Sequence, residues 1–292
     1  MQFNHYLTHV FSGFEQNAIQ LSAKNAACLA ICAELVYADW PLVEKVIQNI
    51  GFEYFKYTDL NGTQSFTVAD NEKIIIAFRG TEISDFRDIA TDVDRDLVLW
   101  DKPQYVPWGA HLWQPLGDVR THEGFSSALN LIWTTLLSQI EECRMQAKGK
   151  ERPIWLCGHS LGGALAHLAA AELWTLKVPL QGIYSFGQPR VGNTDFAAWF
   201  DRALPNKLFR FVNNNDVVPR VPYFSGYQHA GQMVYIDADG DFRNDRLSTM
   251  EMLWDRVRSS VGLDLGSDHK MANYIHLTAK LLGVNNLNLM KW

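Results

Sequence analysis

The sequence has 292 residues, enough for one large domain with a substantial buried core. Apolar residues make up 47% of it and charged residues 20%, which is the composition of an ordinary globular protein and excludes a fibrous or disordered chain. Its formal net charge of −6 argues against a nucleic-acid partner, because contacts to phosphates need a basic surface.

The first residues carry neither the positive segment nor the apolar segment of a secretory signal, so we expect a cytoplasmic location, with processed secretion as the alternative. No run of about 18 apolar residues is present, which predicts no transmembrane segment. The spacing of the cysteines fits neither a disulfide framework nor a zinc site. We therefore expect reduced thiols and neither a metal nor another cofactor. The cysteines are Cys28, Cys32, Cys143 and Cys157.

The N-terminal third begins with the pattern of helices and then changes to strands. The run 25–38 is apolar with Glu34 as its only charge, and Pro41 suits the first turn of a second helix. A hairpin signal follows at Asn61-Gly62. The strands predicted around it are residues 52–57, 65–68 and 73–78.

After residue 120, helix and strand patterns alternate along the chain. This alternation predicts a mostly parallel sheet with helices on both faces. No repeat or linker interrupts it, so we expect residues 1–292 to form a single α/β domain. The predicted helices are residues 123–147, 161–176, 196–203, 249–257 and 270–282, and the predicted strands are residues 154–157, 182–186 and 208–212.

Residues 82–121 do not follow this alternation. The first half of the segment is acidic, and the second half is rich in proline and aromatic residues, including Trp100, Trp108 and Trp113. A long irregular segment inside a compact domain is uncommon and often functional.

The strongest chemical signal is the turn Gly158-His159-Ser160-Leu161-Gly162. A G-x-S-x-G match arises by chance in roughly one chain in ten of this length, so its context decides. A predicted strand leads into the turn and a predicted helix leads out, which is the setting of a nucleophile elbow. The two outer glycines suit the strained backbone that such a serine needs. The N-terminus of the helix then offers N–H groups to a developing oxyanion.

A serine nucleophile needs a histidine base and a carboxylate that orients the base. On this fold the carboxylate follows the serine in the chain, and the histidine comes last. Asp216 lies in the turn after the predicted strand 208–212 and is the best placed acid. Asp195 and Asp201 lie on or near a predicted helix, so we expect them to be solvated surface carboxylates.

Four histidines follow Ser160 and compete for the role of base. His269 lies in the loop just before the last predicted helix and is favoured, because a loop there reaches the carboxyl edge of the sheet. His229, in an earlier loop, is its rival. His167 and His276 fall inside predicted helices and are less suited.

Six motifs occur in a fixed order along residues 70–280. They are Phe78-Arg79-Gly80-Thr81, His122-Glu123-Gly124-Phe125, the elbow with its helix from Gly158 to Ala166, the segment from Phe186 to Asn193, the Asn-Asp-Val-Val-Pro turn at residues 215–219, and Asp268-His269. Together they resemble the class 3 lipase family, the fungal-type triacylglycerol lipases with their bacterial and plant relatives.

The resemblance implies an α/β-hydrolase fold and a catalytic triad. Ser160 would be the nucleophile, Asp216 the orienting acid and His269 the general base. An oxyanion hole would come from Thr81 and the backbone N–H of Leu161. The sequence has no His-Gly-Gly-Gly motif, which counts against the hormone-sensitive-lipase type of esterase.

The family also places a mobile lid after the strand that carries the oxyanion residue. Here the lid corresponds to residues 84–91, within a lid or cap segment of residues 82–121. We expect residues 92–120 to form part of the acyl-binding wall or a lipid-contacting rim, because clustered aromatic side chains suit an interface. The alternative is a loop packed by its own tryptophans.

The function implied by the resemblance is hydrolysis of carboxylic esters of lipids through an acyl-enzyme, with triacylglycerol as the first candidate. The expected partner is an ester or lipid substrate at a lipid–water interface. Phospholipase A1, galactolipid and feruloyl esterase activities on the same fold are the alternatives. A non-catalytic lipase-like binding protein is a further alternative, although its usual mark, a lost triad or oxyanion residue, is not seen.

Overall fold

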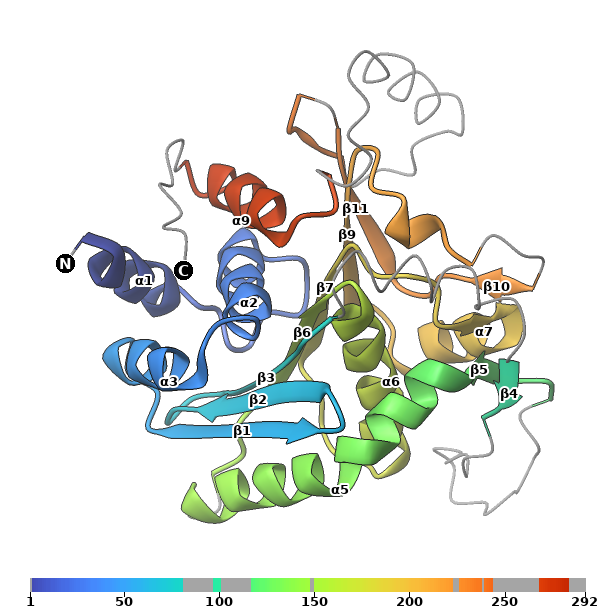
Figure 1. Ribbon diagram of the computed structural model, residues 1–292, viewed down its shortest axis with the longest axis horizontal. Helices are drawn as coiled ribbons and strands as arrows, with labels where there is room; N and C mark the ends of the chain where they lie inside the picture. The colour runs from blue at the N-terminus through green and yellow to red at the C-terminus, as the bar shows by residue number, and fades with distance from the viewer. Residues whose placement is uncertain are drawn as a thin grey trace.

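The computed structural model describes residues 2–80, 97–100, 117–147, 150–222, 226–237, 239–243 and 268–283, and the side chains from residue 7 onward (Figure 1). In that part of the chain, a central sheet of eight strands is covered by helices on both faces. The prediction of an α/β domain with a mostly parallel sheet is therefore confirmed for the described residues. Thr81, the lid segment 84–91, most of residues 92–120 and the predicted helix 249–257 lie outside them.

The central sheet has the strand order β1-β2-β3-β6-β7-β9-β11-β12. The five strands from β3 to β11 run parallel, whereas β1, β2 and β12 pair antiparallel at the two edges. The strands are β1 (Tyr54–Leu60), β2 (Thr63–Ala69), β3 (Ile74–Phe78), β6 (Ile154–His159), β7 (Gly182–Phe186), β9 (Leu208–Asn213), β11 (Gln232–Ile236) and β12 (Phe242–Arg243). Strands β3, β6, β7 and β9 are buried at every position, as expected for parallel strands covered on both faces.

The helices divide into two groups, each covering one face of the sheet. One group is α1 (Gln2–Ser12), α2 (Ala23–Leu35), α3 (Trp40–Asn49) and α9 (Met271–Lys280), which share one hydrophobic core. The other group is α5 (Glu123–Gln146), α6 (Leu161–Thr175) and α7 (Thr194–Ala203), which share a second core on the opposite face. Helix α6 is buried almost all round because it lies between the sheet and α5, which explains its small and apolar sequence.

A second, smaller sheet was not expected from the sequence. It joins β10 (Tyr227–Gln228), β8 (Gly192–Asn193), β5 (Arg120–His122) and β4 (Leu97–Leu99), all antiparallel. Strands of two or three residues are too short to show an alternating pattern, so no sequence signal could reveal them. A side chain at Gly192 would place its Cβ 2.5 Å from the carbonyl oxygen of Arg120, so the pairing of β5 with β8 requires glycine there.

One residue from each of two recognised motifs, His122 and Asn193, stabilises this part of the fold. His122 is the N-cap of α5, where its ring accepts a hydrogen bond from the N–H of Phe125 and stacks on the Phe125 ring. Asn193 is the N-cap of α7 and accepts from the N–H groups of Phe196 and Arg120. These motifs therefore mark helix starts that hold the small sheet against the large one.

Candidate active site

The expected nucleophile, Ser160, lies between the end of β6 and the start of α6. Its backbone has φ 56° and ψ −127°, a conformation that a residue with a side chain adopts only under strain. A Cβ at Gly158 would lie 2.3 Å from the carbonyl carbon of Gly162, and one at Gly162 would lie 2.1 Å from the carbonyl oxygen of Phe78. Both glycines are thus required by close backbone packing, and the predicted elbow is present.

The surroundings of Ser160 suit a developing negative charge. The side chain is fully buried, and its Oγ has no hydrogen-bond partner among the described residues. Helix α6 begins at Leu161, and the first N–H groups of a helix have no partner within the helix. The positive end of the helix dipole therefore points at the turn that holds the serine.

The expected acid and base lie in direct contact. Nδ1 of His269 is 2.9 Å from Oδ2 and 3.0 Å from Oδ1 of Asp216. Asp216 follows β9 and His269 precedes α9, so two segments far apart in the chain meet at the carboxyl end of the parallel strands. The His269 ring lies 4.5 Å from the ring of His159, the residue directly before Ser160, which places the base beside the elbow.

Asp216 accepts hydrogen bonds from two further groups. Its Oδ1 accepts the backbone N–H of Val218 at 3.0 Å, and its Oδ2 accepts the hydroxyl of Tyr274 at 2.5 Å. Tyr274 also accepts the N–H of Asn213, and its burial, followed by the charge of Asp216, raises the pKa of the phenol well above its usual value. A Cβ at Gly187 would lie 2.7 Å from Oδ2 of Asp216 and 2.9 Å from Nδ1 of His269, so the pair fits only against glycine.

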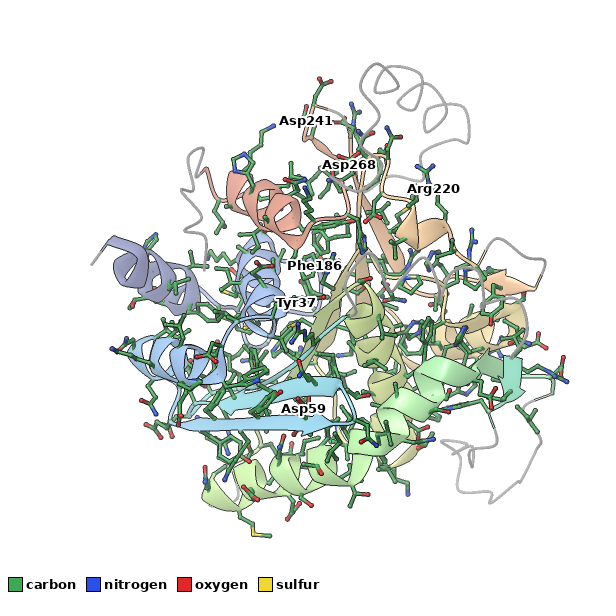
Figure 2. All side chains as sticks on the ribbon, in the orientation of Figure 1. Tyr37, Asp59, Phe186, Arg220, Asp241 and Asp268 are labelled. Carbon is green, nitrogen blue, oxygen red and sulfur yellow. The ribbon has the colours of Figure 1, made fainter. Side chains whose placement is uncertain are left out.

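The residue before the base fixes the loop that carries it. The carbonyl oxygen of Asp268 accepts the side-chain N–H of Asn213 at 2.9 Å, and its carboxylate accepts the backbone N–H of Asn215 at 3.2 Å. Figure 2 shows Asp268 beside the ends of β9 and β11, where these asparagines lie. The Asx-rich turn after β9 therefore binds the Asp268-His269 motif and brings His269 to Asp216.

The structure separates His269 from the other candidate histidines. His229 is turned toward the carbonyl oxygen of Pro219, 2.6 Å from its Nε2, and burial lowers its pKa well below 6.5. His167 lies inside α6 against the side-chain nitrogen of Gln188, and burial lowers its pKa from 6.5 to about 3. His276 is on the exposed side of α9. Of the four, only His269 contacts a carboxylate within the described part of the chain.

The alternative acids are surface residues, as expected. Asp195 is exposed in the first turn of α7. Asp201 is exposed near the end of the same helix, where its carboxylate accepts the N–H of Gly231 at 2.7 Å.

Sequence reasoning missed two tyrosines and a histidine at this site. Tyr274 binds the acid, and the hydroxyl of Tyr37 lies 3.1 Å from Nδ1 of His159. Tyr37 follows α2, far from the motifs that define the site. A single tyrosine carries no pattern in a sequence, so only the packing of α2 and α9 over the sheet reveals these contacts.

The position of Thr81 lies outside the described residues, but its neighbour is described. A Cβ at Gly80 would lie 3.1 Å from Cβ of Ser160 and 2.5 Å from the carbonyl oxygen of His159. The chain that leads from β3 to Thr81 therefore passes directly against the elbow.

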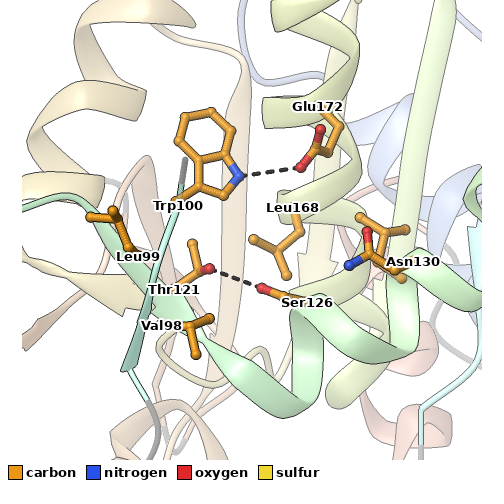
Figure 3. Close-up of a pocket in the computed structure, with 9 residues that line it drawn as sticks. Val98, Leu99, Trp100, Thr121, Ser126, Asn130, Leu168 and Glu172 are labelled. Carbon is orange, nitrogen blue, oxygen red and sulfur yellow. Dashed lines mark hydrogen bonds between the residues drawn. The ribbon is translucent and has the colours of Figure 1, made fainter. Parts of the chain in front are cut away.

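A cavity of about 210 Å³ lies away from these residues, between the small sheet and helices α5 and α6 (Figure 3). Its wall includes Trp100, whose indole N–H donates to Glu172 at 3.2 Å, and Leu168. Trp100 is only 5% exposed and packs on Trp199 with ring centres 4.4 Å apart. The ring of Trp100 is therefore part of the core, and the expectation that residues 92–120 form an acyl-binding wall or a lipid-contacting rim stays a prediction.

No group of three metal-ligating side chains occurs among the described residues. Nor does any helix in the same part of the chain have the length and apolar character needed to cross a bilayer.

The parallel sheet, the strained serine between β6 and α6, and the buried acid–histidine pair define an α/β-hydrolase. A family model described as lipase (class 3) matches residues 75–226, about half of the chain, and the protein belongs to this family. The resemblance that the six motifs suggested is thus confirmed.

Relatives and solved structures agree with this family. The secreted mono- and diacylglycerol lipase MDL3 of Malassezia globosa is 34% identical over 170 residues, 56% of this chain and 51% of that protein. The triacylglycerol lipase OBL1 of Arabidopsis thaliana is 26% identical over 328 residues, 91% of this chain and 62% of that protein. The chain thus spans about half to two thirds of the length of these curated relatives.

Two solved structures show the same fold. The Lip2 lipase of Yarrowia lipolytica matches with a TM-score of 0.56 at 22% identity, over 75% of this chain and 82% of that one. The triacylglyceride lipase of Rhizomucor miehei matches with a TM-score of 0.55 at 24% identity, over 92% of this chain and 93% of that one.

The relatives contradict the expected cytoplasmic location. Several of the Malassezia proteins that match this chain are named as secreted lipases. The expectation rested on the absence of a signal pattern in the first residues, and those residues do not decide where the protein acts.

Proposed function

We propose that the protein is a serine hydrolase that cleaves carboxylic esters of lipids, and that triacylglycerols are its preferred substrates. The observation that carries this proposal is the buried contact of His269 with Asp216 beside the strained backbone of Ser160. The names of the relatives support the substrate class, because they are triacylglycerol and mono- and diacylglycerol lipases.

The proposed reaction is acyl transfer in two steps. His269 removes the proton from Ser160 as the oxygen attacks the ester carbonyl, and Asp216 stabilises the imidazolium that forms. The oxyanion is bound by the N–H of Leu161 at the start of α6 and by Thr81. His269 then gives the proton to the leaving alcohol, and water repeats the sequence on the acyl-enzyme.

The assignment of the nucleophile is tested with Ser160→Ala. We expect the variant to keep its fold and to lose about 10⁴- to 10⁶-fold in kcat, because the residues of a triad act as a unit. A fluorophosphonate probe should label the wild type at Ser160 and leave the variant unlabelled. Near-normal turnover in the variant would refute the proposed function, and intact labelling in the variant would move the nucleophile elsewhere.

The substrate class is tested with a panel of esters. p-Nitrophenyl esters from short to long acyl chains, emulsified triacylglycerol, phospholipid, galactolipid and a feruloyl ester are compared by kcat/KM. The proposal requires that emulsified triacylglycerol or a long-chain ester is cleaved faster than the others. A higher rate on phospholipid, galactolipid or the feruloyl ester would keep the mechanism and replace the substrate.

A further inference from the structure

Tyr37 lies at the junction of three segments that build the proposed site. Its hydroxyl is 3.0 Å from the backbone N of Gly80 and 3.1 Å from Nδ1 of His159. The other ring nitrogen of His159, Nε2, is 2.6 Å from the backbone oxygen of His269. One chain of hydrogen bonds therefore links the end of β3, the residue before the nucleophile and the residue that carries the base.

The direction of each hydrogen bond in this chain is fixed by chemistry. Burial, together with the nearby His269, lowers the pKa of His159 from 6.5 to about 3, so its ring is neutral at working pH. The carbonyl oxygen of His269 can only accept, so Nε2 of His159 carries the hydrogen and Nδ1 is an acceptor. The hydroxyl of Tyr37 then donates to Nδ1, and its oxygen accepts the N–H of Gly80.

The ring of Tyr37 has little freedom to leave this position. The guanidinium of Arg79 lies over it, 5.2 Å from the ring centre, and Arg79 also donates to Gln64 at 2.5 Å. A Cβ at Gly80 would lie 2.6 Å from the Tyr37 hydroxyl oxygen, so the backbone and the phenol are already in close contact.

We propose that Tyr37 is a positioning residue for ester hydrolysis, whose hydroxyl holds the backbone of Gly80 against the nucleophile elbow. Gly80 directly precedes Thr81, the expected oxyanion residue, in the sequence. This inference rests on the proposed function. Tyr37 lies outside residues 75–226, where the family model matches, so the N-terminal helices supply a part of the site.

The variant Tyr37→Phe removes the hydroxyl and leaves the shape of the ring. The N–H of Gly80 and Nδ1 of His159 then lose their partner, and the chain before Thr81 is free to shift. We expect kcat to fall about 10- to 100-fold with KM changed less than about threefold, because an oxyanion donor acts in the transition state and not on the bound ester. The inhibition constant of a boronic acid, which forms a tetrahedral adduct on the serine, should rise by a similar factor.

Tyr57→Phe is the matched control. The Tyr57 hydroxyl donates to Asp59 near the surface, in the hairpin of β1 and β2. This variant should keep wild-type kcat and KM. Thermal unfolding of both variants separates the two roles, since a purely structural tyrosine would lower Tm and leave kcat of the folded enzyme unchanged.

The outcomes separate the inference from the proposed function. If Ser160→Ala is inactive while Tyr37→Phe keeps kcat within about twofold of wild type, the inference is overturned and the proposed function stands. If Ser160→Ala remains active, the proposed function and the inference fail together.

The direction of the hydrogen bonds can also be tested on the wild-type protein, without any variant. Nitrogen NMR of the His159 ring should show hydrogen on Nε2 and an unprotonated Nδ1 from pH 5 to 8. Hydrogen on Nδ1 would reverse the order of donors and overturn the inference.

Discussion

Two kinds of buried histidine lie within the same fold, and they differ in their partners. His269 is 2% exposed and meets the carboxylate of Asp216. His159 and His167 are as deeply buried, but they meet a tyrosine, a backbone carbonyl or an amide. A buried imidazole with an acceptor-only carboxylate on Nδ1 can take a proton on Nε2 and keep it stabilised, whereas burial without a carboxylate keeps the ring neutral. Burial thus keeps the rings of His159 and His167 neutral, whereas His269 lies against a carboxylate.

Removing the carboxylate of Asp216 should remove the difference between His269 and the other buried histidines. This change has the largest expected effect on activity. Asp216→Asn keeps the shape of the side chain but removes the charge that stabilises the imidazolium. We expect kcat/KM on a short-chain p-nitrophenyl ester to fall about 10⁴-fold, as when the acid of a triad is neutralised.

Asp201→Asn is the matched control, because Asp201 is an exposed carboxylate on a backbone N–H. It should keep wild-type kinetics. A loss of less than about tenfold in Asp216→Asn would show that the carboxylate does not stabilise the base.

The neutral histidines should make the fold sensitive to acid. His159 and His167 have pKa values of about 3 in the folded chain and 6.5 when exposed. Between these values the unfolded chain binds more protons, so stability is fully present above pH 6.5 and is lost as the pH falls toward 3. Together the two rings should lower the free energy of unfolding by up to about 5 kcal/mol between pH 7 and 4.5, measured by urea titration.

The variant His167→Gln separates the contribution of a neutral histidine to acid sensitivity from that of the carboxylates. His167→Gln replaces one neutral ring with an amide that does not titrate. It should lose about half as much stability as the wild type loses through these two rings over the same pH range. A wild-type unfolding free energy that stays constant down to pH 4.5 contradicts the assignment of neutral rings.

The smallest effect on activity is expected for Tyr274, whose hydroxyl donates to Asp216. Tyr274→Phe removes the hydroxyl that donates to Asp216, while the backbone N–H of Val218 and the ring of His269 remain. We expect kcat to fall about tenfold with KM nearly unchanged, since one of several hydrogen bonds to the carboxylate is lost. Tyr54→Phe, which removes a hydroxyl bound to Glu142 far from the site, is the control and should keep wild-type kcat.

The sequence predicted the triad candidates Ser160, Asp216 and His269, but not the residues that hydrogen-bond around them. The elbow and the order of acid and histidine follow from the fold, because both partners must come from loops after later strands. The sequence left His229 open as a base, and only the contact of His229 with Pro219 removes it. Tyr37 and Tyr274 could not be predicted, because their partners depend on how α2 and α9 pack over the sheet.

The short strands of the second sheet could not be predicted either, because they too depend on tertiary packing. Long buried strands such as β3 and β7 are visible as apolar runs, whereas β4, β5, β8 and β10 have two or three residues each and show no period. The burial of Trp100 could not be predicted for a related reason. A tryptophan in an irregular, aromatic segment looks the same in a sequence whether it faces lipid or fills a core.

The backbone of Ser160 has a consequence for how the protein can evolve. A residue held at φ 56° and ψ −127° costs the folded state about 1–3 kcal/mol, and glycine would remove most of that cost. A substitution of Ser160 by glycine should therefore stabilise the fold while removing the proposed nucleophile, so stability and chemistry make opposite demands on this one position.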